Sequence, residues 1–356
     1  MSKSRPIVIA ACLAVSLPVV TAQVAAQTVE PTTLAVVGTW SGLPLHRQFE
    51  RPFWTETLPE TSGGAITVEL TTFDQMGVSG ADVYRLLGQG VFDVGATVAD
   101  YTVSDAPELE GLDVPLIATT AEAAREMVDA ARPWVAQSMR ERFNAHMLAV
   151  APYPPQVVFC KPEISSLADL EGLKVRGSGR MTTMFLEALG AEGVNIGFAE
   201  VPGALERGVV DCAITGAGSG YSAGWWEVST HLMTLPLGGW DPVITAINLD
   251  KWESLSPTTQ GLIETAIAEQ FEAPAWEAAA GAFATDIACL TGNGECPAGE
   301  AASMVLVEPS AEDVTLATRA LEEQVLPDWA ERAGADWTRR WNETVGARFD
   351  ADIPLP

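Results

Sequence analysis

Apolar and polar residues follow two alternating patterns along this chain. Short apolar or alternating runs are typical of strands, and the longer segments between them have apolar residues at helical spacing. The expected strands are 33–38, 65–73, 91–99, 156–160, 173–176, 209–214 and 243–249. The expected helices are 45–60, 79–89, 120–131, 133–144, 180–189, 200–207, 256–290 and 310–343. This alternation predicts an α/β fold with mostly parallel sheets and helices on both faces.

A proline-rich segment divides the pattern of strands and helices into two parts. The pattern restarts after Pro152, Pro154 and Pro155, and a second irregular passage lies near residue 240. We therefore expect two lobes joined by paired crossings that act as a hinge, with a ligand cleft between them. The expected boundaries are 27–151 plus 241–283 for the first lobe, 152–240 plus 284–330 for the second, and 331–356 for a C-terminal helix and tail.

Two segments have unusual compositions. Residues 215–224 are rich in Gly and Ser, so we expect a loop beside the cleft. Residues 256–290 are rich in Ala and begin with Ser256 and Pro257, a helix cap followed by a helix-compatible proline. This segment predicts a long helix that Pro274 kinks or divides.

The N-terminus has the composition of a secretory signal peptide over residues 1–26. Lys3 and Arg5 form a basic start, and the apolar run 7–20 is too short to span a bilayer comfortably. Small residues follow, and cleavage is expected after Ala26 or Ala22. A membrane anchor is the alternative interpretation. The signal predicts a periplasmic protein.

Acidic residues dominate the charge of the chain. The formal net charge is −27, and cleavage after Ala26 would remove the two positive charges of Lys3 and Arg5, which gives about −29. Such a surface repels nucleic acid and anionic lipid, so no nucleic-acid partner is expected. A monomer is the default expectation. An anionic ligand would need a cation placed beside it.

Four of the five cysteines remain after cleavage, and an oxidising compartment permits disulfides. Cys289 and Cys296 bracket a segment with Gly and Asn that can turn sharply, so we expect them to be bonded. Cys160 and Cys212 both end strand-like runs and form either a disulfide or two separate buried thiols. The cysteine spacing matches no common zinc pattern, and we expect no cofactor.

Arg176 is the residue best suited to bind an anion. It ends a short apolar run and is followed by Gly177, Ser178 and Gly179. A guanidinium with open backbone beside it suits a planar anion that is held by two parallel hydrogen bonds. The alternative is an arginine paired with a nearby Asp or Glu.

An ordered set of short motifs runs through the chain from about residue 33 to 290. They include Ser62-Gly63-Gly64, Gln75-Met76-Gly77, Leu112-Asp113-Val114-Pro115-Leu116, Leu170 to Arg176, and Ala204 to Asp211. In this order and spacing, the chain resembles the solute-binding proteins of tripartite ATP-independent periplasmic (TRAP) transporters. The resemblance implies a two-lobed periplasmic-binding-protein-like fold with a long helix shared between the lobes. It also implies closure around a carboxylate bound by Arg176, and delivery to a small and a large membrane subunit.

Two departures from the family pattern bear on the ligand. Many relatives carry a second basic residue on the strand that here begins Gln156-Val157-Val158-Phe159. Thr215 stands where an Asn or Gln often meets the ligand. One cation suits one carboxylate, so we expect a monocarboxylate or a 2-oxo or 2-hydroxy acid rather than a dicarboxylate or sialic acid.

Other residues are candidates for ligand contact. Gly238 to Pro242 resembles a Gly-Trp-acid-Pro element in the branch that binds 2-oxo acids, sometimes with a metal ion. Trp240 could then pack on the ligand, and Asp241 could accept a hydrogen bond or help a cation. We expect no metal, because Gly177 offers no ligand atom beside Arg176. The remaining candidates are the aromatic residues Phe159 and Tyr221, and the strand-end residues Trp40 and Thr97. Core packing is the alternative for the aromatics, and ordinary loop or cap roles for the strand-end residues.

Little in the sequence suggests catalysis. The three histidines lie outside any recognisable nucleophile or metal motif. The Gly-Ser-Gly run at 216–220 follows no phosphate-binding pattern. The chain is therefore expected to be a binding protein and not an enzyme, with service to a sensor or another transporter class as the alternative.

Overall fold

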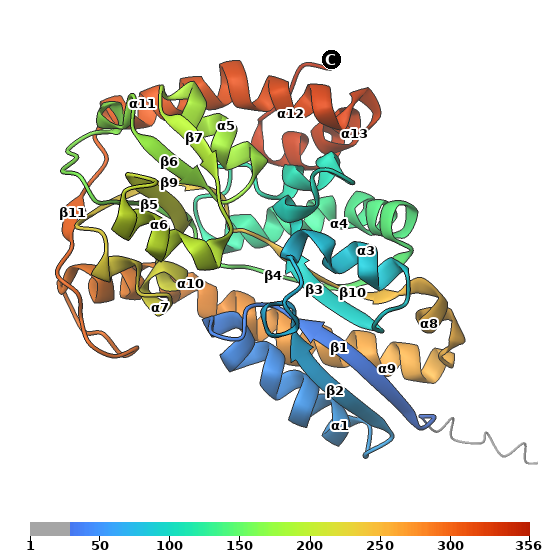
Figure 1. Ribbon diagram of the computed structural model, residues 1–356. Helices are drawn as coiled ribbons and strands as arrows, with labels where there is room; N and C mark the ends of the chain where they lie inside the picture. The colour runs from blue at the N-terminus through green and yellow to red at the C-terminus, as the bar shows by residue number, and fades with distance from the viewer. Residues whose placement is uncertain (1–28) are drawn as a thin grey trace, which may run out of the picture.

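The computed structural model describes residues 29–356, which form two α/β lobes that meet along a seam (Figure 1). The expected signal peptide, and the expected start of the first lobe at residue 27, lie outside the described residues. Within 29–356, no helix combines the length and apolar character needed to cross a bilayer.

The first lobe is built on a five-stranded sheet with strand order β2-β1-β3-β10-β4. Its strands are β1 (Thr32–Gly38), β2 (Ile66–Thr72), β3 (Val94–Val98), β4 (Ala145–Ala151) and β10 (Val243–Asn248). β1 is parallel to β2 and β3, whereas β10 is antiparallel to β3 and β4. All residues of β3 and β10 are buried, as expected for central strands with both faces covered.

The second lobe is built on a six-stranded sheet with strand order β11-β9-β5-β8-β6-β7. Its strands are β5 (Gln156–Cys160), β6 (Lys174–Gly177), β7 (Glu192–Asn195), β8 (Cys212–Gly216), β9 (His231–Gly238) and β11 (Val305–Val307). β6 is parallel to β7 and β8, and β5 is antiparallel to β8 and β9. Both sheets are therefore mixed. In each sheet, one strand runs antiparallel to both of its neighbours: β10 in the first lobe and β5 in the second. By each of these strands the chain enters the sheet from the other lobe.

Two of the crossings between the lobes lie side by side. One runs from β4 to β5 and the other from β9 to β10. Between them the Tyr153 amide donates to the Trp240 carbonyl at 2.9 Å, and the Gln156 amide donates to the Gly239 carbonyl at 3.2 Å. These bonds join the crossings into one two-stranded connection. That this connection acts as the hinge stays a prediction.

Helices cover both sheets, and short 3₁₀ and π-helical turns extend several of them (Figure 1). The α-helices before the second crossing are α1 (Leu58–Thr61), α2 (Phe73–Met76), α3 (Val83–Gly88), α4 (Ala121–Phe143), α5 (Arg180–Ala188), α6 (Val201–Arg207) and α7 (Ala217–Ser222). Those after it are α8 (Leu249–Ser254), α9 (Pro257–Ile267), α10 (Ala273–Thr291), α11 (Ala311–Ala320), α12 (Leu326–Ala333), α13 (Ala335–Trp341) and α14 (Ala347–Phe349).

Several elements differ from the sequence prediction. Helices 120–131 and 133–144 are one helix, α4, with Pro133 inside it. The buried face of α4, which includes Trp134 and Val135, packs in the core, and this packing outweighs the lost backbone hydrogen bond. Strands β4, β7, β9 and β11 were not expected.

The Gly- and Ser-rich segment 215–224 is another correction, because it contains helix α7 instead of a loop. A side chain at Gly218 would collide with Asp286 of α10, and one at Gly220 would collide with Phe159. The glycines therefore let α7 pack closely between β5 and α10. Close packing explains the composition that had indicated a loop.

The long helical stretch is continuous, but its hydrogen bonding changes from α-helical to π-helical just before Pro274. A π-helical turn at Ala268–Glu272 separates α9 from α10. The indole of Trp276 donates to the Val150 carbonyl of the first lobe at 2.9 Å, while the far end of α10 packs on α7 of the second. The helix is thus shared between the lobes, as the family resemblance implied.

Both cysteine pairs are bonded. Cys289 joins Cys296, as expected. Cys160 and Cys212 are directly opposed on the neighbouring strands β5 and β8 and are also bonded, which decides the pairing that the sequence left open.

Candidate functional site

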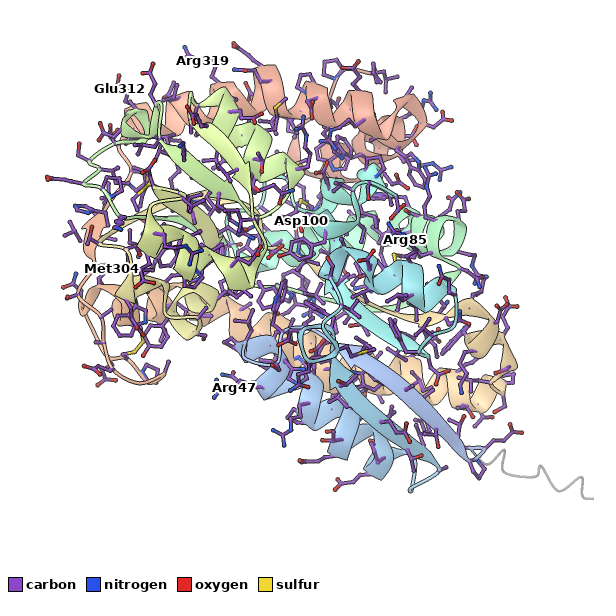
Figure 2. The ribbon with its side chains drawn as sticks, viewed as in Figure 1. Arg47, Arg85, Asp100, Met304, Glu312 and Arg319 are labelled. Atoms are coloured by element: carbon purple, nitrogen blue, oxygen red, sulfur yellow. A yellow bond between two sulfur atoms is a disulfide. The ribbon has the colours of Figure 1, made fainter. Side chains whose placement is uncertain are left out.

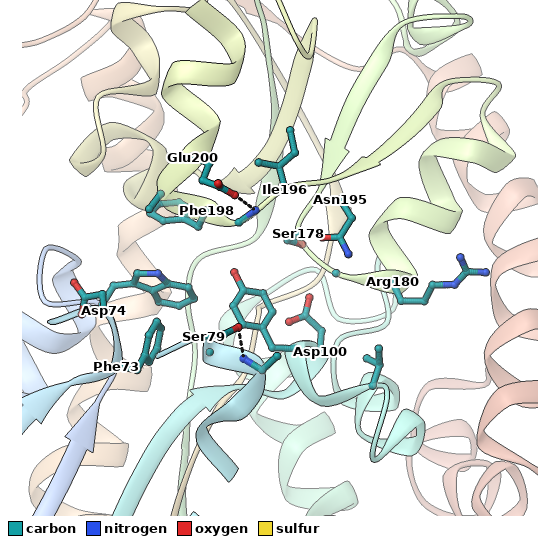
Figure 3. Close-up of a pocket in the computed structure, with 18 of the residues that line it drawn as sticks. Phe73, Asp74, Ser79, Asp100, Ser178, Arg180, Asn195, Ile196, Phe198 and Glu200 are labelled. Carbon is teal, nitrogen blue, oxygen red and sulfur yellow. Dashed lines mark hydrogen bonds between the residues drawn. The ribbon is translucent and has the colours of Figure 1, made fainter. Parts of the chain in front are cut away.

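A cleft of about 790 Å³ lies between the lobes. In Figure 3, Phe73 and Asp100 reach it from the first lobe, and Ser178, Asn195 and Phe198 face them from the second. Figure 2 places Asp100 near the middle of the molecule, where the lobes meet. The cleft is therefore enclosed by side chains from both lobes.

Arg176 is the third residue of β6, and only 1% of its surface is exposed. It does not itself line the cleft but lies behind the cleft wall, where its charge lowers the pKa of the lining residues Asp100 and Tyr101 against the effect of burial. Its Nε donates to the Ile196 carbonyl at 3.0 Å, and its Nη1 donates to the Ile214 carbonyl at 2.7 Å. The guanidinium carbon lies 5.9 Å from the ring centroid of Trp225. The guanidinium is thus held in one orientation by the second lobe. It forms no ion pair with any carboxylate of residues 29–356.

Three aspartates converge near Arg176. Asp100 follows β3, Asp113 follows the 3₁₀ turn Pro107–Leu112, and Asp241 lies in the second crossing. One carboxylate oxygen from each lies within 4.8 Å of the others. Asp100 and Asp113 are each 3% exposed, and Asp241 keeps some exposed surface although its Oδ1 is enclosed.

Burial perturbs the ionisation of this cluster. It raises the pKa of Asp100 and Asp113 well above their usual range, and the neighbouring carboxylates add to the rise. Burial also raises the pKa of Asp241 to about 7, while the positive charge of Arg176 opposes that rise. Three acids share one nearby guanidinium, so the cluster has unbalanced negative charge whenever all three are ionised.

Asp113 organises the turn that carries Asp241. Its Oδ1 accepts from the Asp241 amide at 2.6 Å, and its Oδ2 accepts from Gln156 Nε2 at 3.3 Å. Asp241 has a φ of 45°, a left-handed conformation that aspartate tolerates better than most residues. Gly239 is required next to it, because a side chain there would collide with Asp113. The turn is therefore built around the Asp113 carboxylate.

Aromatic rings line the wider part of the cleft. Trp40 lies 4.8 Å from Phe73 and 5.6 Å from Tyr101 in its own lobe, between ring centroids. It also lies 5.6 Å from Phe198 of the second lobe. Trp40, Phe73, Tyr101 and Phe198 all border the cleft. Such a wall suits an apolar or flat ligand body.

The structure brings some of the sequence candidates together. Arg176 and Asp241 are close enough for the charge of Arg176 to act on the pKa of Asp241, and Trp40 borders the cleft. Thr97 and Thr215 are buried. Thr215 lies on β8, the strand next to Arg176, and Thr97 Oγ1 has no hydrogen-bond partner within 29–356.

Three other candidates contact protein groups away from the cleft wall. The Trp240 indole donates to the Ala118 carbonyl at 2.8 Å. Phe159 is fully buried and packs on Trp225 with 5.5 Å between centroids. The Tyr221 hydroxyl donates to the Glu300 carbonyl at 2.8 Å and its ring borders a different cavity. Contacts of this kind agree with the alternative that these aromatic residues pack in the protein interior.

The sequence interpretation missed Asp100, Asp113, Tyr101 and Gln156. Asp100 and Tyr101 come shortly after the end of the buried strand β3, which contains Thr97, so the rule that selected Thr97 could have selected them as well. Asp113 stood inside a motif that served only to identify the family, and Gln156 was noted only as part of a strand that lacks the second basic residue of many relatives. Their proximity depends on how the crossings pack and has no local signature.

Two mixed sheets, paired crossings and a charged site in the seam define a two-lobed α/β binding protein. The family described as bacterial extracellular solute-binding protein, family 7, matches residues 41–282. The chain belongs to this family, which includes the solute receptors of TRAP transporters, so the family resemblance in the sequence is confirmed.

Solved structures share the fold over nearly their whole length. DctP7, an extracytoplasmic solute receptor of Bordetella pertussis binding pyroglutamic acid, has a TM-score of 0.78 at 21% identity and covers 88% of this chain and 98% of its own. A marine metagenome TRAP solute-binding protein with 3-hydroxybenzoate has a TM-score of 0.74 at 25% identity and covers 90% and 99%. A TRAP solute-binding protein of Desulfovibrio desulfuricans with sn-glycerol-3-phosphate has a TM-score of 0.78 at 21% identity and covers 89% and 97%.

A match to a curated relative covers part of the chain. The uncharacterized protein y4mM of Sinorhizobium fredii is 28% identical over 165 residues, which are 44% of this chain. The chain spans only 29% of the length of that relative.

Proposed function

We propose that this protein is a periplasmic receptor that binds a small organic acid in the cleft between its lobes and delivers it to the small and large membrane subunits of a TRAP permease. It acts as a monomer without catalysis and without nucleic acid. The observation that carries the proposal is Arg176, a buried guanidinium that two backbone carbonyls orient at the seam without a direct ion pair to a carboxylate of residues 29–356.

The preferred ligand is a monocarboxylic acid with a flat or apolar body, including 2-oxo and 2-hydroxy acids. Trp40, Phe73 and Phe198 supply an aromatic wall beside the charged end of the cleft. The 3-hydroxybenzoate and pyroglutamate bound by the structural relatives are acids of this kind, which supports the assignment. The glycerol-3-phosphate bound by another relative shows that this fold also accepts a different anion.

Binding is expected to act through closure of the lobes. The ligand would favour the closed state only through contacts that it makes with both lobes. The lobes are proposed to divide as 27–151 plus 241–283 and 152–240 plus 284–330. Charge-assisted hydrogen bonds from Arg176 would contribute about 1.5–3 kcal/mol each in such a closed cleft.

A thermal-shift screen over organic acids, followed by calorimetric titration of the strongest binder, tests the proposal. Arg176→Lys keeps one positive charge but loses the planar fork, so the affinity should fall at least about 100-fold, from two bonds of about 1.5 kcal/mol. Lys174→Ala, an exposed position on the same strand, is the matched control and should bind normally. Circular dichroism checks that both variants fold.

Two results would contradict the proposal. Unchanged affinity in a folded Arg176→Lys variant would remove Arg176 from the site. Arg180 also borders the cleft and is half-exposed near Asp328, so loss of binding in Arg180→Ala alone would assign the carboxylate to Arg180 instead.

A further inference from the structure

A second cavity lies in the seam between the lobes, apart from the cleft assigned to the acid, which we call the front cleft. This rear cavity has a volume of about 500 Å³. Among the described residues, the two cavities share no lining residue. We propose that the rear cavity binds a small organic cation, a protonated amine on a flat or apolar body, with the carboxylate of Asp286 as its counter-ion.

Both lobes and the connection between them supply the walls of the rear cavity. The first lobe contributes Leu45 and Phe49, the first crossing contributes Pro152 to Pro154, and the second lobe contributes α7. One face of α10, which lies beside α7 in Figure 1, forms a further wall. The segment after Cys296, which a disulfide ties to the end of α10, also borders the space. A concave space of this volume with mostly apolar walls is typical of small-molecule sites.

The face of α10 that borders the rear cavity leaves the space open. Its lining residues before Asp286 are all small, namely Ala275, Ala278, Ala279, Gly281, Ala282 and Thr285. A side chain added at Gly281 would meet nothing within 4 Å, whereas one at Gly218 of α7 would collide with Asp286. Glycine inside a helix costs about 1 kcal/mol relative to alanine. Close packing explains the glycine of α7 but does not explain Gly281, which borders free space.

Asp286 gives the rear cavity its selectivity. Among the described residues that line the cavity, Asp286 alone carries a charge. It is partly buried and forms no ion pair within residues 29–356. The Gly218 amide donates to it, which uses one of about four acceptor positions of a carboxylate. An unpaired carboxylate in an apolar cavity favours a cation over a neutral molecule and repels an anion.

The aromatic residues of the wall favour a cation with an organic body. Phe49, Tyr153 and Tyr221 border the cavity, and the faces of such rings attract ammonium groups. The Tyr221 ring stacks on Trp226 with 6.3 Å between centroids, so it is held in place. A single carboxylate offers fewer oxygen ligands than a calcium ion takes. The net charge of −27 also attracts small cations from solution.

The ionisation of Asp286 ties amine binding to pH. Burial raises the pKa of Asp286 to about 7, and the Gly218 amide opposes that rise. Among the described residues, no charged side chain contributes to this shift, and the other titratable groups of the wall are the phenols of Tyr153 and Tyr221. A protonated amine pairs only with the ionised carboxylate, so its affinity should rise about tenfold between pH 6 and pH 8.

Because both lobes line the rear cavity, its occupant also bears on how the lobes are arranged, and this step rests on the proposed function. In the described arrangement, the rear cavity is open to a ligand while Gly179 of the second lobe lies against Asp100 in the front cleft. A cation that contacts Phe49 of the first lobe and α7 of the second favours that arrangement. An acid that binds the same arrangement and the amine would each raise the affinity of the other by the same factor.

The test uses the full mature protein without acid, with benzylamine as the cationic probe and benzyl alcohol as its neutral counterpart. Calorimetry at pH 8 should show one site for the amine, and the alcohol should bind at least about tenfold more weakly. Asp286→Asn keeps the shape of the side chain and should lose both about tenfold in affinity and the pH dependence. Glu277→Gln, which removes an exposed acid of the same helix outside the cavity wall, is the matched control and should bind normally.

A second pair of variants tests the space instead of the charge. Ala278→Leu enlarges an exposed side chain of the wall and should weaken amine binding by about tenfold, because it occupies room that the ligand needs. Ala280→Leu changes an exposed alanine of the same helix that does not line the cavity, and it should leave the affinity unchanged.

Three outcomes would overturn the rear site. They are the absence of amine binding at millimolar concentration, binding that Asp286→Asn leaves intact, and loss of binding in Asp100→Asn, which would place the amine in the front cleft. Amine binding without any acid binding would support the rear site and reject the acid receptor. Acid binding that depends on Arg176 without amine binding would do the reverse. Equal acid affinities with and without benzylamine would reject the coupling between the two sites.

Discussion

The seam between the lobes holds two cavities that differ in chemistry. The front cleft, of about 790 Å³, meets the charged cluster through Asp100. The rear cavity, of about 500 Å³, is bordered by the π-helical turn His46–Glu50, the first crossing, α7 and α10. Many of its lining residues are small, and Tyr153, Tyr221 and Asp286 also border it. Trp40 borders the front cleft and Tyr153 the rear cavity, and their rings meet edge to face at 6.0 Å.

Each cavity has a buried acid with a raised pKa, so this property alone does not mark the ligand site. In the rear cavity, burial raises the pKa of Asp286 to about 7, but a backbone amide at Gly218 stabilises its ionised form. In the front cleft, several buried acceptors without donors lie near one oriented guanidinium. The comparison shows that a raised pKa is not enough to identify a binding site. What distinguishes the front cleft from the rear cavity is that several buried acids without hydrogen-bond donors lie together beside a guanidinium.

The largest expected effect is on stability as a function of pH. Asp241 has a folded pKa of about 7 and an unfolded value near 3.9, so between these values the folded state holds a proton that the unfolded state has released. The stability is therefore present at low pH and is lost as pH rises from about 4 through about 7, by on the order of 1–4 kcal/mol.

Thermal melts at pH 5 and pH 8 should accordingly show the lower Tm at pH 8. Asp241→Asn should remove the part of this loss that comes from Asp241, whereas Asp100 and Asp113, whose pKa values are also raised by burial, keep their part. Asp286→Asn should remove the contribution of the rear cavity. A Tm that stays level or increases between pH 5 and pH 8 would show that these acids are not protonated in the folded state.

An intermediate effect is expected from Gly179→Ala in the front cleft. The new methyl group would overlap the Asp100 carboxylate in the described arrangement of the lobes. Overpacking of this kind costs about 1–3 kcal/mol, so if the acid binds to this arrangement its affinity should fall about tenfold or more. Gly42→Ala, where a methyl group meets open space, is the control. Equal affinities in the two variants would mean that the bound state does not require this approach of the lobes.

The smallest effect is expected in the rear cavity, from Tyr221→Phe. This change removes a hydroxyl that donates to the Glu300 carbonyl, at a stability cost of about 0.5–1.5 kcal/mol. Acid affinity measured by calorimetry should stay within about twofold of the unmodified protein, because the ring borders the rear cavity. A larger loss of affinity would extend the ligand site to the rear and return Tyr221 to the contact residues expected from the sequence.

Much of the fold could be predicted from local pattern. Strands such as β1, β5 and β10 were expected because most of their residues are apolar, as is typical of buried strands. Edge strands such as β7 and β11 escaped notice because they are short and partly exposed. The glycines of α7 were misread because close packing and loop formation favour the same small residue.

The sequence by itself determined the two-lobed α/β organisation, the place of Arg176 at the end of a strand, and the Cys289–Cys296 bond, because each depends on residues near one another in the chain. Only the tertiary structure decided that Asp113 and Asp241, 128 positions apart, share a hydrogen bond beside Asp100 and Arg176. The periodicity of apolar residues shows which side of a helix or strand is buried. The packing of the whole lobes decides which strand ends and crossings lie next to one another. The charged groups of the site come together only through that packing.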